Sequence, residues 1–450
     1  MAKDGSVIIV GGGIAGLAAA SKLGEAGFSV IVLEARNRIG GRIFTRRERG
    51  DSSVEFGAEF IHGLPPEIWE PVQENGLGVN EVEGESWCAS DEGILPCRFF
   101  REVESILEKM DDSSPDESFL DFLKRRFPNP KHDSREEEIK QRAIRYVSGF
   151  NAADPAQIGV HWLVQSTRAE VGIQGHRAFR LKGGYEGLLD IFRKRIADKD
   201  IKVHTNCVVE RVSWQKGAAE VTTHSAEQTH SISFKARYLL STLPLGLLKA
   251  PVGEEGAVQF APQLPAGKLG ALDKLEMGEV IRVTLLFRDR FWDAICPPPE
   301  RDKPLSEMSF LLSQDEWFPT WWTAMPDKAP MITGWAPFRS ARRLSGQNSS
   351  FVVEHALSTL GKLLGMNSSD LKDRLTGAYF HDWQKDPFAR GAYSYGKVGG
   401  HGAQQALGAP VENTLFFAGE ATDTTGHNGT VHGAIASGYR AAGEIVRAAG

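Results

Sequence analysis

The sequence has few cysteines, and none of them has the spacing of a C-x-x-C motif. Four of its 450 residues are cysteine, and none of the four forms a C-x-x-C pair: Cys88, Cys97, Cys207 and Cys296. This spacing indicates neither a disulfide framework nor a zinc site, so no metal is expected. A reducing, cytoplasmic setting is the simplest interpretation.

An excess of positive charge is also lacking, as are long apolar runs at the two ends. Lys and Arg number 52 against 58 for Asp and Glu, a net charge of −6, which favours neither nucleic acid nor an anionic membrane as a partner. Residues 1–6 are too short for a signal peptide, and residues 441–450 carry no tail of about 20 apolar residues. We therefore expect neither secretion nor a membrane anchor.

Glycine, in contrast, is abundant, at 48 residues of 450, above the average of about 7%. It has no three-residue period and 41% of the residues are hydrophobic, which excludes collagen-like chains. Nine glycines lie in residues 1–41 and eleven in residues 391–438. Because glycine lets backbone approach a ligand closely, the pattern predicts one site built from both ends of the chain.

The first glycine cluster has the pattern of a dinucleotide-binding β-α-β unit. An apolar strand over 7–10 precedes Gly11-x-Gly13-x-x-Gly16, and a helix and a second strand ending at Glu34 follow. Gly11 permits the tight turn, Gly13 lets a pyrophosphate reach the backbone, and Gly16 lets helix and sheet pack closely. Glu34 is expected to bind the adenosine ribose. The unit by itself fits NAD and FAD equally.

The next stretch distinguishes the two cofactors. This stretch resembles the E-A-x-x-R-x-G-G-R sequence of the FAD-dependent amine oxidase superfamily. It reads Glu34-Ala35-Arg36-Asn-Arg38-Ile-Gly40-Gly41-Arg42. In that family the last arginine approaches the pyrophosphate, which needs a fixed cationic donor. A solvated basic loop would explain Arg36 and Arg38 but not the Gly-Gly-Arg that follows.

The resemblance extends along most of the chain. Residues 56–63, F-G-A-E-F-I-H-G, are similar to the G-A-x-W-I-H-G segment of polyamine oxidases, which passes over the flavin and presents a residue at the position of His62 to the substrate. Val209 falls in a strand whose backbone meets the adenine in the family. Residues 383–395, 415–420 and 429–434 resemble its W-x-x-D-P-x-x-R-G-S-Y-S, F-A-G-E and V-H-G-A elements. By position, Glu420 binds near the ribityl chain and the Val431 amide stabilises charge on the reduced ring.

The family fold implies an α/β protein with two interleaved domains. One is a Rossmann-like, doubly wound FAD-binding domain over 1–75, 178–250 and 384–450; the other is an α+β substrate-binding domain over 76–177 and 251–383, with a mixed, mostly antiparallel sheet. The predicted cofactor-binding residues are Gly11, Gly13, Ala15, Gly16, Glu34, Ala35, Arg36, Gly41, Arg42, Gly57, Ala58, Glu59, Phe60, Val209, Gly419, Glu420, Thr430 and Val431.

The chemistry that the resemblance implies is oxidation of an amine. An alkyl amine has a pKa of about 10.4, so deprotonating it at pH 7 costs roughly 4.6 kcal/mol, and an apolar pocket helps because it disfavours the cation. The neutral amine gives a hydride to the flavin, the imine is hydrolysed to an aldehyde, and dioxygen reoxidises the flavin and yields hydrogen peroxide. Ala392 stands where monoamine oxidases carry the flavin-linked cysteine, so FAD is expected to be noncovalent.

Two positions depart from the related enzymes. Monoamine oxidases use two facing tyrosines; Tyr393 matches one and Thr430 occupies the other, which suggests room for a bulky, secondary or polyamine-like substrate. Arg282 replaces a lysine that holds a water against the flavin in the family, and arginine is bulkier and never a base. The predicted catalytic residues are His62, Arg282, Tyr393, Thr430 and Trp383.

The sequence is also compatible with two other functions. A related desaturase or dehydrogenase with another electron acceptor shares the N-terminal motif, and a non-catalytic FAD-binding partner protein shares the fold. The expected partners are a small amine and dioxygen, and the chain is expected to be a monomer or a homodimer.

Overall fold

The two ends of the chain meet in a parallel sheet of five strands. The computed structural model describes residues 5–47, 53–90, 92–128, 134–224, 231–299 and 302–450. The strand order is β10–β2–β1–β14–β23, and all four pairings are parallel. These strands are β1 (Ser6–Val10), β2 (Ser29–Leu33), β10 (Lys202–His204), β14 (Tyr238–Ser241) and β23 (Leu415–Phe417).

Alternate residues of β1 face two different cores, because successive side chains of a strand point to opposite faces. Val7 and Ile9 pack with three helices, α1 (Ile14–Glu25), α7 (Glu186–Ala197) and α14 (Val431–Ala449). Ile8 and Val10 instead pack with β11 (Val208–Gln215) and β12 (Ala218–His224) of a second, four-stranded sheet. That sheet also contains β13 (Ile232–Ala236) and β15 (Gln259–Ala261).

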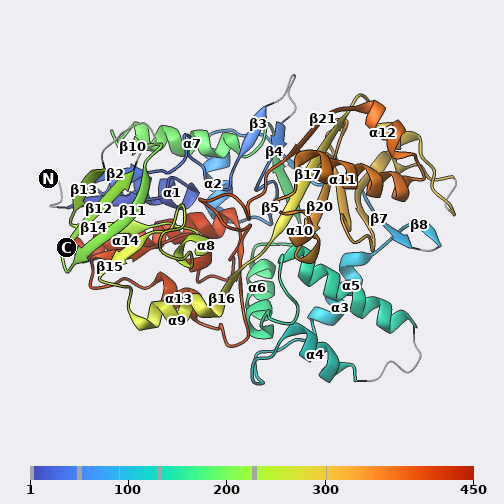
Figure 1. Ribbon diagram of the computed structural model, residues 1–450. Helices are drawn as coiled ribbons and strands as arrows, with labels where there is room; N and C mark the ends of the chain where they lie inside the picture. The colour runs from blue at the N-terminus through green and yellow to red at the C-terminus, as the bar shows by residue number, and fades with distance from the viewer. Residues whose placement is uncertain (1–4, 48–52, 91, 129–133, 225–230, 300–301) are drawn as a thin grey trace.

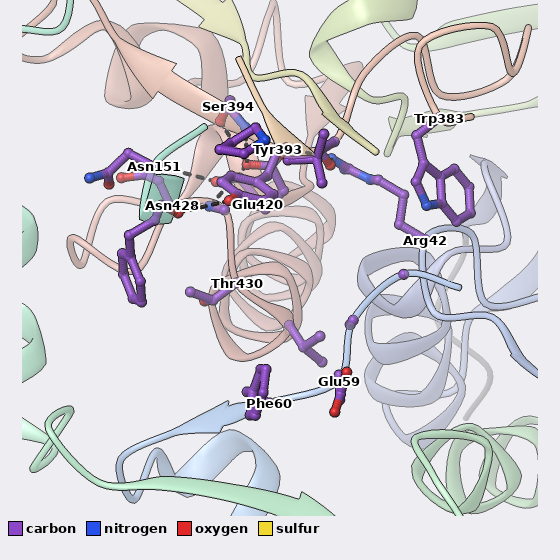
Figure 2. A pocket seen from close by; sticks show the side chains of 18 of the residues that line it. Arg42, Glu59, Phe60, Asn151, Trp383, Tyr393, Ser394, Glu420, Asn428 and Thr430 are labelled. Atoms are coloured by element: carbon purple, nitrogen blue, oxygen red, sulfur yellow. Dashed lines mark hydrogen bonds and ion pairs between the residues drawn. The ribbon is translucent and has the colours of Figure 1, made fainter. Parts of the chain in front are cut away.

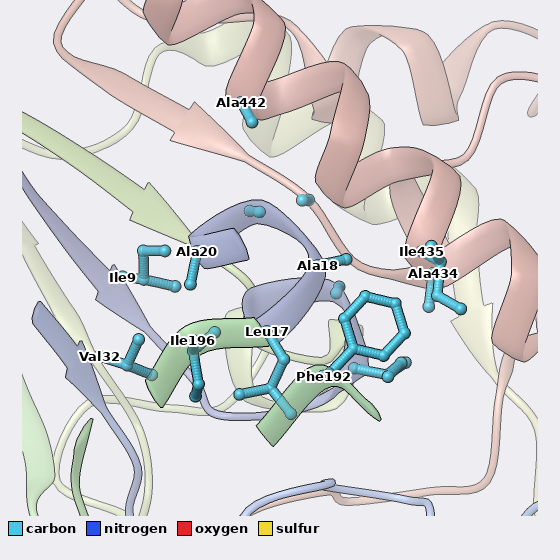
Figure 3. Close-up of a cluster of buried hydrophobic side chains, with 14 of the residues drawn as sticks. Ile9, Leu17, Ala18, Ala20, Val32, Phe192, Ile196, Ala434, Ile435 and Ala442 are labelled. Atoms are coloured by element: carbon cyan, nitrogen blue, oxygen red, sulfur yellow. The ribbon is translucent and has the colours of Figure 1, made fainter. Parts of the chain in front are cut away.

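Small residues let α1 and α14 pack close to each other and to the sheet. Figure 3 shows Ala18 of α1 beside the stretch of α14 that holds Ala434 and Ile435, with Phe192 of α7 in the same cluster. Ala18 and Ile435 are fully buried. Figure 1 shows the three helices on one side of the molecule with the parallel sheet. The predicted α/β fold with a Rossmann-like unit is thus present.

The other half of the molecule is a sheet of seven strands in the order β21–β17–β20–β19–β18–β7–β8. Only the β18–β7 pairing is parallel, so the sheet is mixed and mostly antiparallel. Its strands are β7 (Glu85–Ser90), β8 (Gly93–Pro96), β17 (Val280–Phe287), β18 (Met308–Leu312), β19 (Thr320–Thr323), β20 (Met331–Pro337) and β21 (Leu375–Phe380). α10 (Arg339–Leu344), α11 (Ser349–Leu364) and α12 (Ser368–Arg374) pack on it.

Four helices form a third block beside this sheet (Figure 1). They are α3 (Phe99–Leu107), α4 (Phe119–Arg126), α5 (Ser134–Phe150) and α6 (Val160–Gly172). Residues of all four share one apolar cluster that includes Phe119, Phe122 and Val147. The remaining elements are β3 (Thr45–Arg47), β4 (Ser53–Glu55), β5 (Ile61–His62), β6 (Val79–Glu81), β9 (Ala178–Leu181), β16 (Leu275–Met277), β22 (Ser394–Gly396), α2 (Pro66–Glu74), α8 (Leu245–Leu248), α9 (Ala266–Lys274) and α13 (Ala403–Gly408), with short 3-10 turns at Phe291–Ala294, Leu305–Glu307 and Glu420–Thr422.

The cysteine prediction was wrong for one pair. Cys88 and Cys97 form a disulfide, with their Cα atoms 5.6 Å apart. The β7–β8 hairpin brings Cys88 opposite the end of β8, and Cys97 follows that end directly. The spacing of cysteines in the sequence does not reveal that a hairpin makes two of them neighbours. Cys207 and Cys296 are free, and the disulfide removes the argument for a reducing compartment.

No helix in the described part of the chain is long and apolar enough to cross a membrane. The residue boundaries of the two interleaved domains stay a prediction.

Candidate functional site

A cavity of about 1630 Å³ runs through the molecule, larger than the roughly 300–1000 Å³ usual for a single small ligand. One end lies where β1, β2 and β14 finish, at Gly11, Glu34 and Thr242. Ligands bind at this carboxyl edge in open α/β sheets. All predicted site residues except Gly16 line the cavity. The volume therefore has room for a dinucleotide and a substrate.

The glycine loop at this end requires residues without side chains. Gly11 has a φ of +109°, and a Cβ atom there would lie 2.5 Å from the Thr242 hydroxyl oxygen. A Cβ on Gly16 would lie 2.1 Å from the Gly11 carbonyl oxygen. Gly16 thus serves the packing of α1 on the loop, whereas Gly11 and Gly13 line the cavity. Such a loop at a helix N-terminus suits a pyrophosphate.

Glu34 is held in place by backbone. Its two carboxylate oxygens accept hydrogen bonds from the Gly12 amide at 2.8 Å and the Arg36 amide at 2.9 Å. The side chain is buried, and this burial raises the pKa of the carboxyl group. The guanidinium of Arg36 pairs with Asp386 at 2.5 Å. Asp386 is a residue that sequence reasoning missed, although it lies within the quoted W-x-x-D-P motif.

Further along the cavity, Arg42 and Glu420 join the two ends of the chain (Figure 2). Arg42 donates to a Glu420 carboxylate oxygen at 2.9 Å and to the Ala392 carbonyl at 2.7 Å. The other Glu420 oxygen accepts from the Ser394 hydroxyl at 2.6 Å and from the Gly429 amide at 3.0 Å. Ser394 was not predicted. Arg42, Glu420, Ser394 and Gly429 thus form one hydrogen-bonded polar group midway along the cavity.

Thr430 and Val431 lie where α14 opens on the cavity. The Thr430 hydroxyl accepts from the Gly433 amide at 3.0 Å and donates to the His427 carbonyl at 2.6 Å. It therefore caps α14, a role that the catalytic prediction did not include. Val431 is the first residue of the helix and lines the cavity, which places the positive end of the helix dipole there.

The far end of the cavity is aromatic, and there Tyr393 donates its hydroxyl to the Phe150 carbonyl at 2.7 Å. Buried Trp383 instead lies near Arg36, with 5.9 Å from the guanidinium to the ring centre, and donates its indole N–H to the Phe56 carbonyl at 2.8 Å. Figure 2 places Phe60 on the opposite side of the cavity from Tyr393. The ring of Phe150 lies edge-on to His62, with 5.3 Å between ring centres. This end can hold an apolar alkyl chain.

His62 is a basic side chain in the aromatic part. Burial lowers the pKa of its imidazole to about 4, so the ring is neutral at pH 7 and can accept a proton or a hydrogen bond. Glu170 of α6 also lines the cavity, and burial raises the pKa of its carboxyl group to about 7. Sequence reasoning missed Glu170, which lies outside every quoted motif.

Two cationic and one acidic side chain meet in the wall next to Phe60. Arg282 of β17 donates to Glu59 at 2.6 Å and to the Gly57 carbonyl at 3.0 Å. Arg180 of β9 donates to the other Glu59 oxygen at 2.7 Å. Glu59 was predicted to bind the cofactor, but its carboxylate is used within the wall. Of the other predicted cofactor residues, Ala15, Ala35, Gly41, Ala58, Val209 and Gly419 line the cavity.

Residues 14–89 and 98–446 match the family described as flavin containing amine oxidoreductase. The chain belongs to this family. Membership confirms the resemblance drawn from the motifs and the FAD cofactor expected from them. The enzyme class expected from the motifs, an FAD-dependent amine oxidase, is the class of this family.

The similar proteins within the family are named either as lysine-specific histone demethylase homologues or as polyamine oxidases. Lysine-specific histone demethylase 1 homolog 2 of Arabidopsis thaliana is 28% identical over 99% of this chain and 59% of its own length. Polyamine oxidase 4 of Oryza sativa subsp. japonica is 27% identical over 98% of this chain and 89% of its own length. The chain thus spans little more than half of the first relative and most of the second.

Solved structures of amine oxidases share the fold. Putrescine oxidase, in its wild-type form bound to putrescine, has a TM-score of 0.79 at 21% identity, covering 98% of this chain and 99% of the other. Cyclohexylamine oxidase from Brevibacterium oxydans has a TM-score of 0.77 at 20% identity, covering 99% of both. The α/β fold predicted from the motifs is confirmed.

Proposed function

We propose that the protein oxidises a polyamine-like or bulky secondary amine with noncovalent FAD. The observation that carries this proposal is the continuity of the cavity. The glycine loop and Glu34 lie at one end. The Arg42–Glu420 ion pair lies at the middle, and an aromatic compartment with His62 and Glu170 lies at the other end.

The residues present fit FAD. Gly11, Gly13 and Glu34 would hold the nucleotide part, Arg42 and Glu420 the middle, and the N-terminus of α14 at Val431 the ring. Bound FAD supplies the acceptor for the hydride that leaves the carbon next to the amine nitrogen. With alanine at position 392 no thiol is present there for a covalent link, and we expect acid-denatured protein to release its FAD into solution.

The aromatic compartment lowers the cost of deprotonating the substrate. An apolar wall disfavours the ammonium form of an amine, and the neutral His62 imidazole can accept a hydrogen bond from the amine N–H. Phe60, Phe150 and Tyr393 would orient the C–H bond towards the flavin. Hydrolysis of the resulting imine gives an aldehyde and an amine, and dioxygen as final acceptor gives hydrogen peroxide.

Glu170 supports a substrate with a second positive charge. Glu170 is half-buried and lines the cavity, and desolvation raises the pKa of its carboxyl group to about 7 with no cation to oppose the shift. Ion pairs and hydrogen bonds to side chains are absent from the Glu170 carboxylate among the described residues. A second ammonium group of a diamine or polyamine would supply the missing partner.

An anaerobic amine panel tests this function. Purified protein is loaded with FAD and mixed with spermine, spermidine, putrescine, a monoamine and a polyene, and the flavin absorbance is followed. Bleaching by polyamines supports the proposal. Bleaching by the polyene indicates the desaturase alternative, and a yellow protein that no compound bleaches indicates a non-catalytic FAD-binding partner.

Arg282 favours one second candidate, an amine dehydrogenase with another acceptor. The family has a lysine at this position, whereas the Arg282 guanidinium is immobilised by Glu59 and Gly57. Mixing anaerobically reduced protein with air separates the two. Reoxidation within seconds supports the oxidase, and reoxidation over many minutes supports the dehydrogenase. The monomeric or homodimeric state and the cytoplasmic location stay predictions.

A further inference from the structure

Glu59 joins two arginines that come from different parts of the fold. Arg180 belongs to β9 and Arg282 to β17, the second strand from one edge of the seven-stranded sheet. Glu59 lies between them in the segment after β4, and it accepts 2.7 Å and 2.6 Å hydrogen bonds from the two guanidinium groups. The Trp322 indole N–H lies 3.1 and 3.2 Å from the two carboxylate oxygens.

The group is buried and carries a net positive charge. The exposed fractions of the side chains are 14% for Arg180, 13% for Glu59 and 5% for Arg282. The two arginines hold the pKa of Glu59 below its usual value despite its burial. Two guanidinium cations and one carboxylate leave one excess positive charge in this group, of which Glu59 and Arg282 line the cavity. Burying such a group is costly unless its donors and acceptors are paired.

The hydrogen bonds of Arg282 fix the guanidinium at two points. One terminal nitrogen is held by Glu59 and the other by the Gly57 carbonyl. The Nε atom is buried and has no partner in the described part of the chain. Gly57 and Arg282 both line the cavity. Both Glu59 carboxylate oxygens are engaged by side chains of the wall, Arg282 among them.

We propose that Glu59 is a positioning residue that fixes the Arg282 guanidinium at Gly57, so that a positive charge in the cavity wall faces the flavin ring. The inference rests on the proposed function, and it takes residues 57–60 to pass over the flavin ring, as their resemblance to the polyamine oxidase segment implies. Reduction of a flavin adds negative charge, and a nearby fixed cation stabilises that charge. The strength of this stabilisation depends on the distance between them.

The flavin midpoint potential of four FAD-loaded proteins tests the proposal. They are the wild type, E59D, R282M and the double variant E59D/R282M. E59D keeps the negative charge but shortens the side chain by one methylene group, so it alters the position of Arg282 and not the charge of the wall. E81D is the matched control, because Glu81 also lines the cavity and pairs with Arg177 at 2.6 Å.

We expect R282M to shift the two-electron equilibrium towards oxidised flavin at least tenfold, about 30 mV. E59D should shift it in the same direction at least fivefold, about 20 mV. In the R282M background, E59D should shift it less than twofold, because the residue that it positions is gone. E81D should leave the potential unchanged.

Two results would overturn the proposal. One is an E59D potential equal to that of the wild type, and the other is an equal E59D shift with and without Arg282. Should E59D fail to retain FAD, W322F replaces it, since it removes the indole donor from Glu59 and keeps the carboxylate; the same dependence on Arg282 is expected. An FAD-loaded protein that no amine reduces would overturn the proposed function alone, because the potentials are measured without an amine.

Discussion

Arg42 and Glu420 lie 378 positions apart in the sequence and form a 2.9 Å ion pair inside the cavity. Both segments also contain glycines that line the same space, Gly41 beside Arg42 and Gly419 beside Glu420. The ion pair therefore links the two glycine-rich ends of the chain at the middle of the proposed FAD site.

We expect E420Q to weaken FAD binding by roughly 10–100-fold, since a hydrogen bond to a charged group contributes about 1.5–3 kcal/mol. The amide keeps the shape but loses the charge that opposes Arg42, and its nitrogen cannot accept from Ser394 or Gly429. Titration of the apoprotein with FAD measures the change. E444Q, which breaks the Arg440–Glu444 pair on α14, is the control and should bind FAD as the wild type does.

The pH dependence of turnover tests His62. Because its pKa is lowered to about 4, the imidazole is already neutral at pH 5. For a monoamine, which does not need Glu170, we therefore expect kcat/KM to rise with pH towards the pKa of the substrate amine, with no separate bend near 6.5. H62A should lower kcat about 10²–10⁴-fold. Unchanged kinetics in H62A would remove His62 from the site.

Stability gives an independent check on the same group. The folded state holds His62 with a lowered pKa, so between pH 6.5 and 4 the unfolded state binds more protons than the folded state. The contribution of His62 to stability is thus present above pH 6.5 and is lost as pH falls to about 4. Urea unfolding of wild type and H62Q at pH 7 and pH 4.5 should show the larger acid loss in the wild type.

The cofactor half of the site could be predicted from the sequence because its signals are local. The apolar runs and glycines of residues 7–34 specify a strand, a turn, a helix and a strand, and the structure has these elements as β1, α1 and β2. Glu34 follows β2 directly, so its place at the sheet edge follows from the element order. Its hydrogen bonds to the Gly12 and Arg36 amides are local as well.

The substrate half could not be predicted in the same way. Phe150 and Glu170 lie at or near the ends of α5 and α6, and they reach the cavity only because these helices pack beside a sheet formed by residues far along the chain. Glu59 was placed at the cofactor because its motif is there, but its partners Arg180 and Arg282 follow 121 and 223 positions later. Side-chain pairing over such separations has no local pattern.

Glu170 predicts a difference between classes of amine. E170Q should raise the Kd of spermine or putrescine about tenfold and leave that of a monoamine of equal length unchanged, since only the former lose a charge-assisted hydrogen bond. Anaerobic titration of the flavin absorbance gives both constants. E108Q, at another cavity-lining carboxylate, is the control. Equal losses for the monoamine and the diamine would contradict a second ammonium site at Glu170.

Glu55 predicts a loss of stability as pH rises from about 4.5 to about 8. Its carboxylate accepts from the Thr45 hydroxyl at 2.8 Å and from the Tyr185 amide at 2.7 Å, and burial raises its pKa from 4.5 to about 8. Between these two pH values the folded state binds more protons than the unfolded state, so the free energy of unfolding falls as pH rises, by up to roughly 1.4 kcal/mol per pH unit. E55Q has no proton to lose and should flatten this fall. Urea unfolding at pH 5, 6.5 and 8 measures it, and parallel slopes for E55Q and the wild type would show that Glu55 titrates normally in the folded protein.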